Sequence, residues 1–274
     1  MSTASYDALL DWFRDRGSAL VAYSGGVDST LLAKAAADAL GERAVAVTAV
    51  SESLAPAELD EACALAERIG ISHLLERSDE TSKPQYLAND GERCYHCKTE
   101  LYSICERIAS ERDLNVIVNG LNTDDLSDHR PGNRAADEAG VRSPFVELGF
   151  DKRAIREQSR RLDLPTADKP ELACLASRFP TGTPITISGL ERVGAAEQVV
   201  AGLGFSQYRV RFHGDLARIE VPAAEIGRLA DDELREKLLD GVRGAGFRFV
   251  TVDLSGYARG SSNAVAMSEA VDSD

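Results

Sequence analysis

Apolar residues recur along the first part of the chain with two periods, one typical of strands and one typical of helices. A nearly continuous apolar run predicts a strand buried on both faces at 43–50, and shorter apolar stretches predict strands at 17–23, 71–76 and 115–119, with a candidate fifth at 143–148. An amphipathic pattern predicts a helix at 6–15, and high helix propensity predicts one at 29–40. Further helices are predicted at 56–69, between Pro56 and Gly70, at 95–112, and at 151–162, where Asp151 is a cap. Because strands and helices alternate, we expect an α/β fold with a doubly wound parallel sheet.

The pattern changes near residue 186. Helices are predicted at 186–203 and, in one or two pieces, at 223–239, and strands at 207–213, 216–221 and 247–253. Gly214-Asp215 is a tight-turn signal that joins the first two of these strands as a hairpin. We therefore expect three parts: a doubly wound domain at 1–185, a smaller α+β domain at 186–263, and a frayed acidic tail at 264–274.

The chain is acidic, with a formal net charge of -14 and 45 Asp and Glu against 31 Lys and Arg. Only six of the basic residues are lysines: Lys34, Lys83, Lys98, Lys152, Lys169 and Lys237. This composition fits a salt-adapted, halophilic surface, because salt screens dense negative charge, but it also fits an ordinary acidic protein. It argues against a broad nucleic-acid footprint, which requires clustered Lys and Arg.

No long uncharged apolar run is present, so no membrane span is predicted. The first residues lack the basic region and apolar core of a signal peptide. We therefore expect a cytoplasmic protein, in which cysteines are free, catalytic or metal-bound rather than paired in disulfides.

The loop after the first strand carries Ser24-Gly25-Gly26-Val-Asp28-Ser29 and leads directly into a helix. The first N–H groups of that helix lack helical partners, and two glycines let the backbone approach a ligand closely. Such a turn predicts an anion site, most often for phosphate. Because parallel sheets bind ligands beyond the carboxyl ends of their strands, the loops after Tyr23, Val50, Arg77 and Asn119 should meet there.

The segment Ser24–Ser29 resembles the PP-loop of the ATP pyrophosphatase superfamily. The resemblance implies that ATP is cleaved between its α- and β-phosphates, that AMP is transferred to a substrate oxygen, and that pyrophosphate leaves with Mg²⁺. It also implies roles for the loop: Ser24, Gly25, Gly26 and Ser29 hold the phosphates, and Asp28 faces the metal. Asp124 and Asp125 are further carboxylate candidates for Mg²⁺, although both could simply cap a loop before a short helix.

The five cysteines fall into two groups. Cys63 and Cys105 lie on apolar helix faces and are expected to be small packing residues. Cys94 and Cys97 form a CxxC just before a predicted helix, whose N-terminus would lower the pKa of a thiol, and Cys174 lies between Lys169 and Arg178. A lone CxxC is compatible with redox, zinc or iron–sulfur chemistry, and the second CxxC or His pair of a usual zinc site is absent from the sequence.

Three further segments, Asn119–Gly132, Lys169–Pro180 and Arg209–Val221, together with the loop and the CxxC, resemble the LarE family of ATP-dependent sulfur transferases. The family makes the sulfur-bearing ligand of the nickel-pincer cofactor of lactate racemase from a pyridinium dicarboxylate mononucleotide. The resemblance implies that ATP adenylates a ring carboxylate and that sulfur then displaces AMP.

Cys174 matches the family's sulfur-donor cysteine. In one version of the family that cysteine gives up its own sulfur and becomes dehydroalanine. In another, three cysteines hold a [4Fe-4S] cluster that carries an extra sulfide, and Cys94, Cys97 and Cys174 supply such a set here. We favour the cluster version, because its open iron would allow repeated turnover.

The resemblance also implies that Arg209 and Arg211, which alternate on one predicted strand, bind the phosphate of the substrate and that Glu220 orients them. Either arginine could instead belong to a solvated strand face. Arg259 is a third candidate, but the family pattern places its arginine directly after Tyr257, where this chain has Ala258. A homo-oligomer is expected from the family alone.

Three other functions compete with this interpretation. A tRNA thiolase shares the loop and often the cluster, but it requires a basic surface or an added RNA-binding module. An ammonia-using amide synthetase of the NAD or GMP synthetase type would give Cys174 no role. A non-catalytic nucleotide-binding module would leave the carboxylates and cysteines unexplained.

Overall fold

The computed structural model describes residues 4–127, 131–170 and 173–258. The chain forms two compact units. The first comprises Met1–Glu80 and Glu92–Leu172, and the second comprises Thr81–Gly91 and Ala173–Asp274. The chain therefore passes between the units three times.

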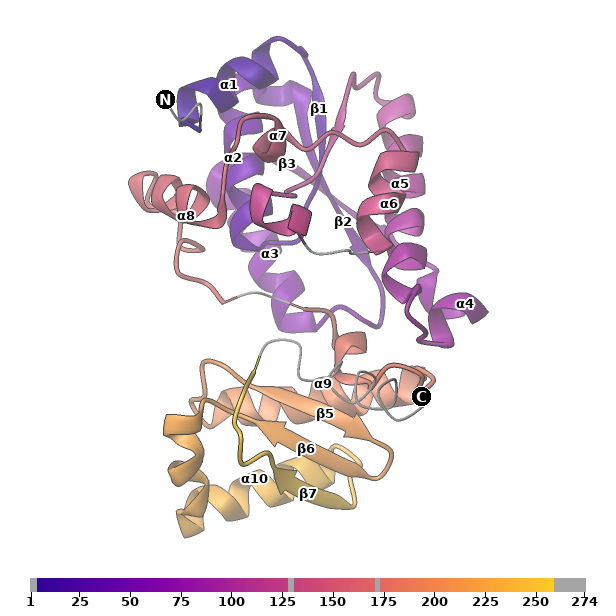
Figure 1. The fold of residues 1–274 in the computed structure, drawn as a ribbon, viewed down its shortest axis with the longest axis vertical. Helices are drawn as coiled ribbons and strands as arrows, with labels where there is room; N and C mark the ends of the chain where they lie inside the picture. Colours follow the sequence, from indigo (N-terminus) through magenta and orange to yellow (C-terminus); the bar gives the residue numbers. More distant parts are fainter. Residues whose placement is uncertain (1–3, 128–130, 171–172, 259–274) are drawn as a thin grey trace, which may run out of the picture. The chain divides into compact units, whose positions relative to one another are not determined.

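A four-stranded, all-parallel sheet lies at the centre of the first unit (Figure 1). Its strands are β1 (Ala19–Ala22), β2 (Ala44–Val50), β3 (Ser72–Arg77) and β4 (Ile117–Val118), arranged in the order β3-β2-β1-β4. The order reverses at β1, because β2 lies on one side of it and β4 on the other. The predicted parallel α/β fold is confirmed, and the four strands fall within the predicted ranges to one or two residues.

Helices cover both faces of this sheet, as Figure 1 shows. They are α1 (Tyr6–Arg14), α2 (Val27–Leu40), α3 (Pro56–Ile69), α5 (Arg93–Glu111), α6 (Pro131–Glu138), α7 (Pro144–Glu147) and α8 (Lys152–Arg161). Side chains of β1 alternate between the faces, so Ala19 and Val21 pack in the core that includes α1, α2 and α8. Leu20 packs on the other face against Ile104 and Ile108 of α5.

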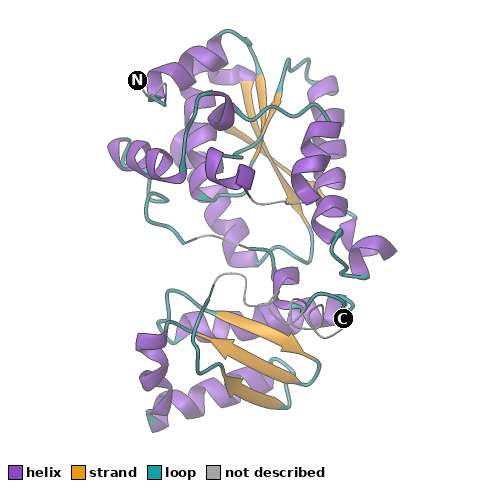
Figure 2. Cartoon of the chain, in the orientation of Figure 1, coloured by secondary structure: helices purple, strands orange, loops and turns teal. Residues whose placement is uncertain are grey.

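The second unit contains a small mixed sheet (Figure 2). Strand β5 (Arg209–His213) pairs antiparallel with β6 (Leu216–Glu220), which pairs parallel with β7 (Phe249–Val252). The helices α9 (Ile187–Gly202) and α10 (Asp232–Gly244) contact each other, and α9 contacts β5 while α10 contacts β7. Short helical turns occupy Leu175–Arg178 and Ala223–Ala230, so the predicted helix at 223–239 is divided into two pieces.

The compact units divide differently from the boundary predicted at residue 186. The segment 81–91, which contains the short helix α4 (Pro84–Leu87), packs with residues that precede α9. The Ile185 N–H donates to the Leu87 carbonyl at 2.8 Å, and the Asn89 side-chain amide donates to the Pro180 and Thr183 carbonyls, each at 2.8 Å. These hydrogen bonds join 81–91 to 180–185, and residues from Ala173 onward belong to the second unit.

Two local predictions are wrong. The candidate strand at 143–148 is the helix α7, which begins at Pro144, a residue that favours the first helical position. The sheet continues there only as a bridge between Val118 and Arg142. Helix α5 begins at Arg93 rather than near 95, so the CxxC lies within its first turns and not before it.

None of the described helices is long and apolar enough to cross a membrane. Arg259 and the predicted acidic tail at 264–274 lie outside the described residues.

Candidate functional site

The glycine loop leaves β1 at Tyr23 and enters α2 at Val27. Ser24 and Ser29 hold the two ends of the loop together. The Ser24 N–H donates to the Ser29 Oγ at 3.2 Å, and the two hydroxyls are 3.1 Å apart. Gly26 is the N-cap of α2 and has no side chain to cap it, so the first N–H groups of the helix remain available to an anion.

Gly25 is fixed by two independent constraints. Its φ of +69° lies in the left-handed region, which L-residues with a side chain rarely adopt. A Cβ at this position would also lie 2.9 Å from the Cβ of Ala62 on α3, which is closer than real contacts allow. The loop thus packs backbone against helix, and only glycine fits there.

Asp28, in the first turn of α2, accepts hydrogen bonds from two other side chains of the candidate site. Its Oδ2 accepts a hydrogen bond from the Lys152 ammonium at 2.6 Å, and its Oδ1 accepts a longer one from the Asn122 side-chain amide at 3.4 Å. Burial raises the pKa of Asp28, Lys152 opposes this effect, and the negative charge of Asp125 adds to it.

Asp124 and Asp125 lie in the short helical turn Thr123–Ser127 and bind the backbone of the two residues that contact Asp28. The Asp124 Oδ2 accepts the Lys152 backbone N–H at 2.9 Å, and the Asp125 Oδ2 accepts the Asn122 N–H at 3.3 Å. Among the described residues, no three His, Cys, Asp or Glu side chains are arranged to hold a metal ion on their own. The carboxylates still fit Mg²⁺ bound with nucleotide, which takes one or two protein carboxylates plus phosphate oxygens.

A second lysine, Lys169, approaches the same loop from another side. Its ammonium contacts the Gly25 carbonyl at 3.4 Å, Glu58 at 3.2 Å and Glu61 at 2.7 Å. The lysine is mostly buried, and Arg156 of α8 donates to its backbone carbonyl at 2.9 Å.

The loops after β2 and β3 are joined through a buried carboxylate. Glu80 is 4% exposed, and its Oε1 accepts hydrogen bonds from Ser51 at 2.6 Å and Ser53 at 2.5 Å. The start of the loop after β1 is bonded to β2, because the Thr48 hydroxyl on β2 donates to the Tyr23 carbonyl at 2.9 Å. The same hydroxyl contacts Nε2 of His73 on β3 at 2.8 Å. Burial lowers the pKa of His73. The loops predicted to meet at the carboxyl edge of the sheet are thus linked by hydrogen bonds.

Sequence reasoning did not assign Lys152, Asn122 or Glu80 to the site, and it treated Lys169 only as a neighbour of Cys174. These residues lie far from the loop in sequence; Lys152 and Asp28 are 124 positions apart. One signal was available for the lysines. In a chain whose basic residues are mostly arginine, two of only six lysines contact the glycine loop or its first helical turn.

The CxxC lies on α5 in the first unit. Cys94 is exposed and Cys97 is partly buried, and their spacing of three places them on one side of the helix. Arg134 of α6 pairs with Glu92 and stacks on the Tyr95 ring, 4.0 Å from its centroid, which fixes the start of α5. Cys105, further along α5, is buried, and burial raises the pKa of its thiol to about 12, so it is a packing residue. Cys63 on α3 is only partly buried.

Cys174 lies in the second unit and is exposed, on a loop whose backbone carbonyls are bound by a buried arginine. Arg178 is 4% exposed and forms a two-pronged ion pair with Glu197 of α9, with both N–O distances at 2.8 Å. Its remaining nitrogen, Nη1, donates to the Ala173 carbonyl at 2.7 Å and to the Cys174 carbonyl at 3.1 Å. A buried charge therefore fixes the backbone that presents the thiol.

The arginine strand β5 lies in the same unit and contacts the same loop. Arg211 donates to the Ser177 carbonyl at 3.0 Å and to Glu220 Oε2 at 2.8 Å, and Glu220 is fully buried. Burial lowers the pKa of Arg209, and the nearby positive charges of Arg178 and Arg211 lower it further. A guanidinium in such surroundings favours an anion beside it. The structure therefore brings Arg209, Arg211 and Glu220 to the loop of Cys174.

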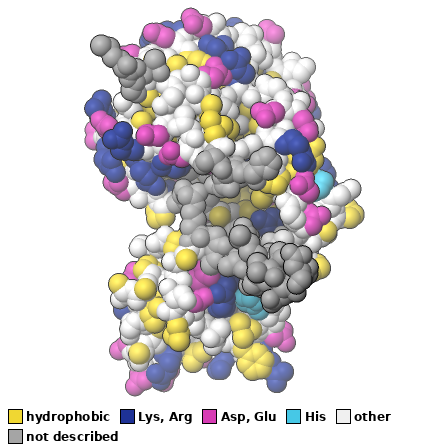
Figure 3. All heavy atoms as spheres, in the orientation of Figure 1, with side chains coloured by type: hydrophobic (Ala, Val, Ile, Leu, Met, Phe, Trp, Pro, Cys, Tyr) yellow, Lys and Arg dark blue, Asp and Glu magenta, His cyan; other side chains and the backbone are white. Residues whose placement is uncertain are grey.

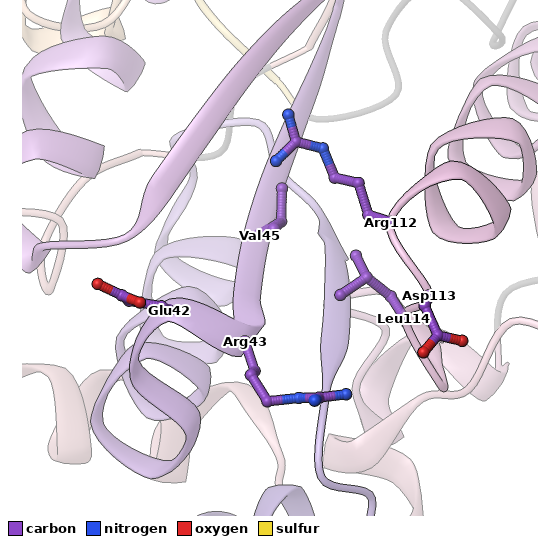
Figure 4. Close-up of a pocket in the computed structure, with 6 residues that line it drawn as sticks. All are labelled: Glu42, Arg43, Val45, Arg112, Asp113 and Leu114. Carbon is purple, nitrogen blue, oxygen red and sulfur yellow. The ribbon is translucent and has the colours of Figure 1, made fainter.

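Two other surface features lie outside this arrangement. Beyond Lys152 and Arg156, which contact the candidate site, helix α8 carries Arg153, Arg160 and Arg161. Figure 3 shows basic and acidic side chains gathered on one face of the first unit. A cavity of about 320 Å³ is lined by Glu42, Arg43, Val45, Arg112, Asp113 and Leu114 (Figure 4). It lies at the amino ends of the strands, since Val45 is at the start of β2 and Leu114 precedes β4. It is therefore not part of the candidate site, which lies at the carboxyl ends.

The parallel sheet and the glycine loop that leads into α2 define a class: α/β proteins in which a glycine turn joins the first strand to a helix N-terminus, a geometry suited to an anion. Comparison with known proteins narrows the class. The chain is 38% identical over 253 residues to the pyridinium-3,5-bisthiocarboxylic acid mononucleotide synthase of Lactiplantibacillus plantarum, which covers 91% of this chain and 90% of that protein. The chain belongs to the family of this synthase, the LarE family.

Two further relatives are uncharacterised proteins. One, from Synechocystis sp., is 46% identical over 265 residues, which covers 97% of this chain and 99% of that protein. The other, from Methanocaldococcus jannaschii, is 27% identical over 238 residues, which covers 87% of this chain and 90% of that protein. No family model matches the chain.

Proposed function

We propose that this protein is an ATP-dependent sulfur transferase of nickel-pincer cofactor biosynthesis. It adenylates a carboxylate of a pyridinium dicarboxylate mononucleotide and replaces AMP with sulfur. Family membership supports the general activity, since the Lactiplantibacillus plantarum relative is named as the synthase of the bisthiocarboxylic acid mononucleotide. The two polar clusters of this chain support the two chemical steps.

In the first step, a substrate carboxylate oxygen attacks the α-phosphorus of ATP, and the bond from that phosphorus to the β-phosphate oxygen breaks. Ser24, Gly25, Gly26 and Ser29 bind the phosphates with the N–H groups at the start of α2. Asp28, with Asp124 and Asp125, would hold Mg²⁺, which neutralises the charge of the leaving pyrophosphate. Lys152 and Lys169 add positive charge beside the loop.

In the second step, sulfur attacks the acyl adenylate and AMP leaves. Where Cys174 is itself the donor, its thiolate forms a thioester, and loss of the Cys174 α-proton then breaks the Cβ–Sγ bond. The products are a thiocarboxylate and dehydroalanine, and the step requires no external oxidant or reductant. Arg209 and Arg211 are proposed to hold the phosphate of the mononucleotide, with Glu220 orienting them. Arg259, which lies outside the described residues, is a further candidate for this role.

A [4Fe-4S] cluster on Cys94, Cys97 and Cys174 is the alternative source, and it would supply a bound sulfide in place of the Cys174 sulfur. Thiolates are suitable ligands, but the described side chains form no group that holds a metal ion. Cys94 and Cys97 lie in the first unit, and Cys174 lies in the second. We therefore derive no step through the cluster.

One observation carries the proposal. Cys174 is exposed, and its backbone is held by Arg178, a residue buried beside the two arginines of β5. A nucleophilic or donor thiol is thus presented next to a positively charged region suited to a phosphorylated substrate. An amide synthetase that uses ammonia has no need of this arrangement.

The test uses anaerobically prepared protein, ATP, Mg²⁺ and the pyridinium substrate. Iron and acid-labile sulfide per chain are measured first, and the intact mass is measured before and after turnover. A mass loss equal to H₂S, absent in Cys174→Ser, supports Cys174 as donor, and iron with unchanged mass supports the cluster. If Cys174→Ser forms product at the wild-type rate, the proposed sulfur transfer is wrong. A salt-dependent gel shift with tRNA would instead favour the tRNA thiolase.

A further inference from the structure

The ion pair between Lys152 and Asp28 occupies the position at which the nucleotide-bound metal is proposed to sit. Lys152 is the first residue of α8, and Asp28 is the second residue of α2. Their side chains are 24% and 23% exposed, so the pair borders solvent rather than lying in the core. A ligand can therefore reach the 2.6 Å contact without unfolding either helix.

Two carboxylates of the site bind Lys152, Asp124 at its backbone N–H and Asp28 at its ammonium. Asp151 caps the helix by accepting the Ala154 N–H at 2.6 Å, and Asp124 accepts the Lys152 N–H at 2.9 Å. These bonds fix the backbone of Lys152 beside the short turn that carries Asp124. The ammonium then extends to Asp28 on a flexible four-carbon chain, so it can move while its backbone stays in place.

We propose that Lys152 is an exchangeable counter-ion: it neutralises Asp28 in the nucleotide-free protein, and Mg²⁺ displaces it onto the phosphates of ATP. This inference rests on the proposed function for the identity of the nucleotide. Mg²⁺ binds carboxylate oxygen at about 2.0–2.1 Å and shares its other positions with phosphate oxygens. A lysine released from Asp28 Oδ2 remains within reach of those oxygens, where an ammonium acts as a point charge.

The type of residue matters to this exchange. A guanidinium would bind the Asp28 carboxylate with two parallel hydrogen bonds and would resist displacement. An ammonium makes a single contact with Oδ2 and leaves Oδ1 to Asn122. The chain uses lysine at this position although 31 Lys and Arg include only six lysines.

The experiment compares Lys152→Met and Lys152→Arg with a matched control, Lys34→Met. Lys34 also lies on α2 and pairs with Asp38 at 2.5 Å, with side-chain exposures of 25% and 35%, but it is outside the site. Two affinities are measured for each protein. One is for Mn²⁺ alone, by electron paramagnetic resonance, and the other is for α,β-methylene-ATP at saturating Mn²⁺.

The exchange predicts opposite signs for the two affinities of Lys152→Met. Removing the competing cation tightens Mn²⁺ binding about fivefold. Removing a phosphate contact weakens analogue binding about tenfold. Lys152→Arg should not tighten Mn²⁺ binding, and Lys34→Met should change neither affinity.

The inference is overturned if Lys152→Met leaves Mn²⁺ affinity unchanged, or if it weakens both affinities, as a merely structural role would. Failure of the proposed function gives a different result. If wild-type protein releases no pyrophosphate with ATP and the pyridinium substrate, the proposed adenylation is wrong, whereas the exchange is still decided by Mn²⁺ and analogue binding.

Discussion

The ion pair between Arg178 and Glu197 makes the sharpest prediction for the second unit. Both side chains are nearly fully buried, with exposures of 5% and 9%. Arg178→Met removes both bonds to Glu197 and the two bonds to the carbonyls of Ala173 and Cys174. Because the change leaves the Glu197 carboxylate buried without its counter-ion, it should destabilise the second unit by about 3–5 kcal/mol.

The double variant Arg178→Met/Glu197→Met separates charge from packing. Replacing both partners of a buried pair with apolar residues of similar volume is often nearly neutral. We therefore expect the double variant to recover part of the stability lost by Arg178→Met, since Glu197→Met also leaves the buried Val210 N–H without its acceptor. It should not recover the position of the Cys174 loop, because its carbonyls still lack the guanidinium. The rate at which Cys174 is alkylated should therefore differ from the wild-type rate in both variants.

The assay must report each unit separately, because a single two-state unfolding energy is not defined for two compact units. Hydrogen exchange of α9 and β5 reports the second unit. Fluorescence of Trp12, which is the single tryptophan and is buried on α1, reports the first unit and should be unchanged. The control is Arg235→Met, which breaks an exposed pair with Asp232 and should cost no more than about 0.5 kcal/mol. The reasoning is refuted if Arg178→Met costs no more than this control, or if the double variant is as unstable as the single one.

Three further predictions concern the first unit and use Trp12 fluorescence during urea unfolding. Gly25→Ala should cost about 1–3 kcal/mol, because its φ of +69° and its contact with α3 exclude a Cβ; wild-type stability would show that the loop is not so constrained. Glu80→Ala should cost about 1–3 kcal/mol by leaving the hydroxyls of Ser51 and Ser53 without their acceptor, and no loss would mean that these hydroxyls rebond to water. Burial lowers the pKa of His73, so the folded state favours the neutral ring; its contribution is complete above pH about 6.5 and is lost as pH falls through the folded pKa. His73→Gln should therefore flatten the decline of stability below pH about 6.5, and an unchanged decline would assign it to other groups.

Much of the first unit could be predicted because its local signals agree with its fold. The residues 44–48 of β2 are buried on both faces, and the glycine loop lies between a strand and a segment of high helix propensity. The segment 143–148 was misassigned because its apolar residues resemble a strand over so short a length. Pro144, a residue that favours the first position of a helix, is the local signal for the helix that forms there instead.

The site was harder to predict than the fold, because its contacts join distant positions. The loop residues Ser24 to Ser29 can be found from local sequence. Lys152 reaches Asp28 across 124 positions, and Glu80 reaches Ser51 across 29, so neither pairing has a local pattern. The family resemblance indicated Cys174 and the arginines of β5 as candidates. It did not indicate that the buried Arg178 would bind the backbone carbonyls of Ala173 and Cys174.

The triple passage of the chain between its units constrains how the protein can be divided. A cut at residue 172 would leave the first unit carrying segment 81–91 without the partners of that segment. Asn89 would lose the Pro180 and Thr183 carbonyls that its side-chain amide now contacts. The two units are therefore not interchangeable modules. Moving the second unit to another protein would require the eleven residues 81–91 as well as the C-terminal segment that begins at Ala173.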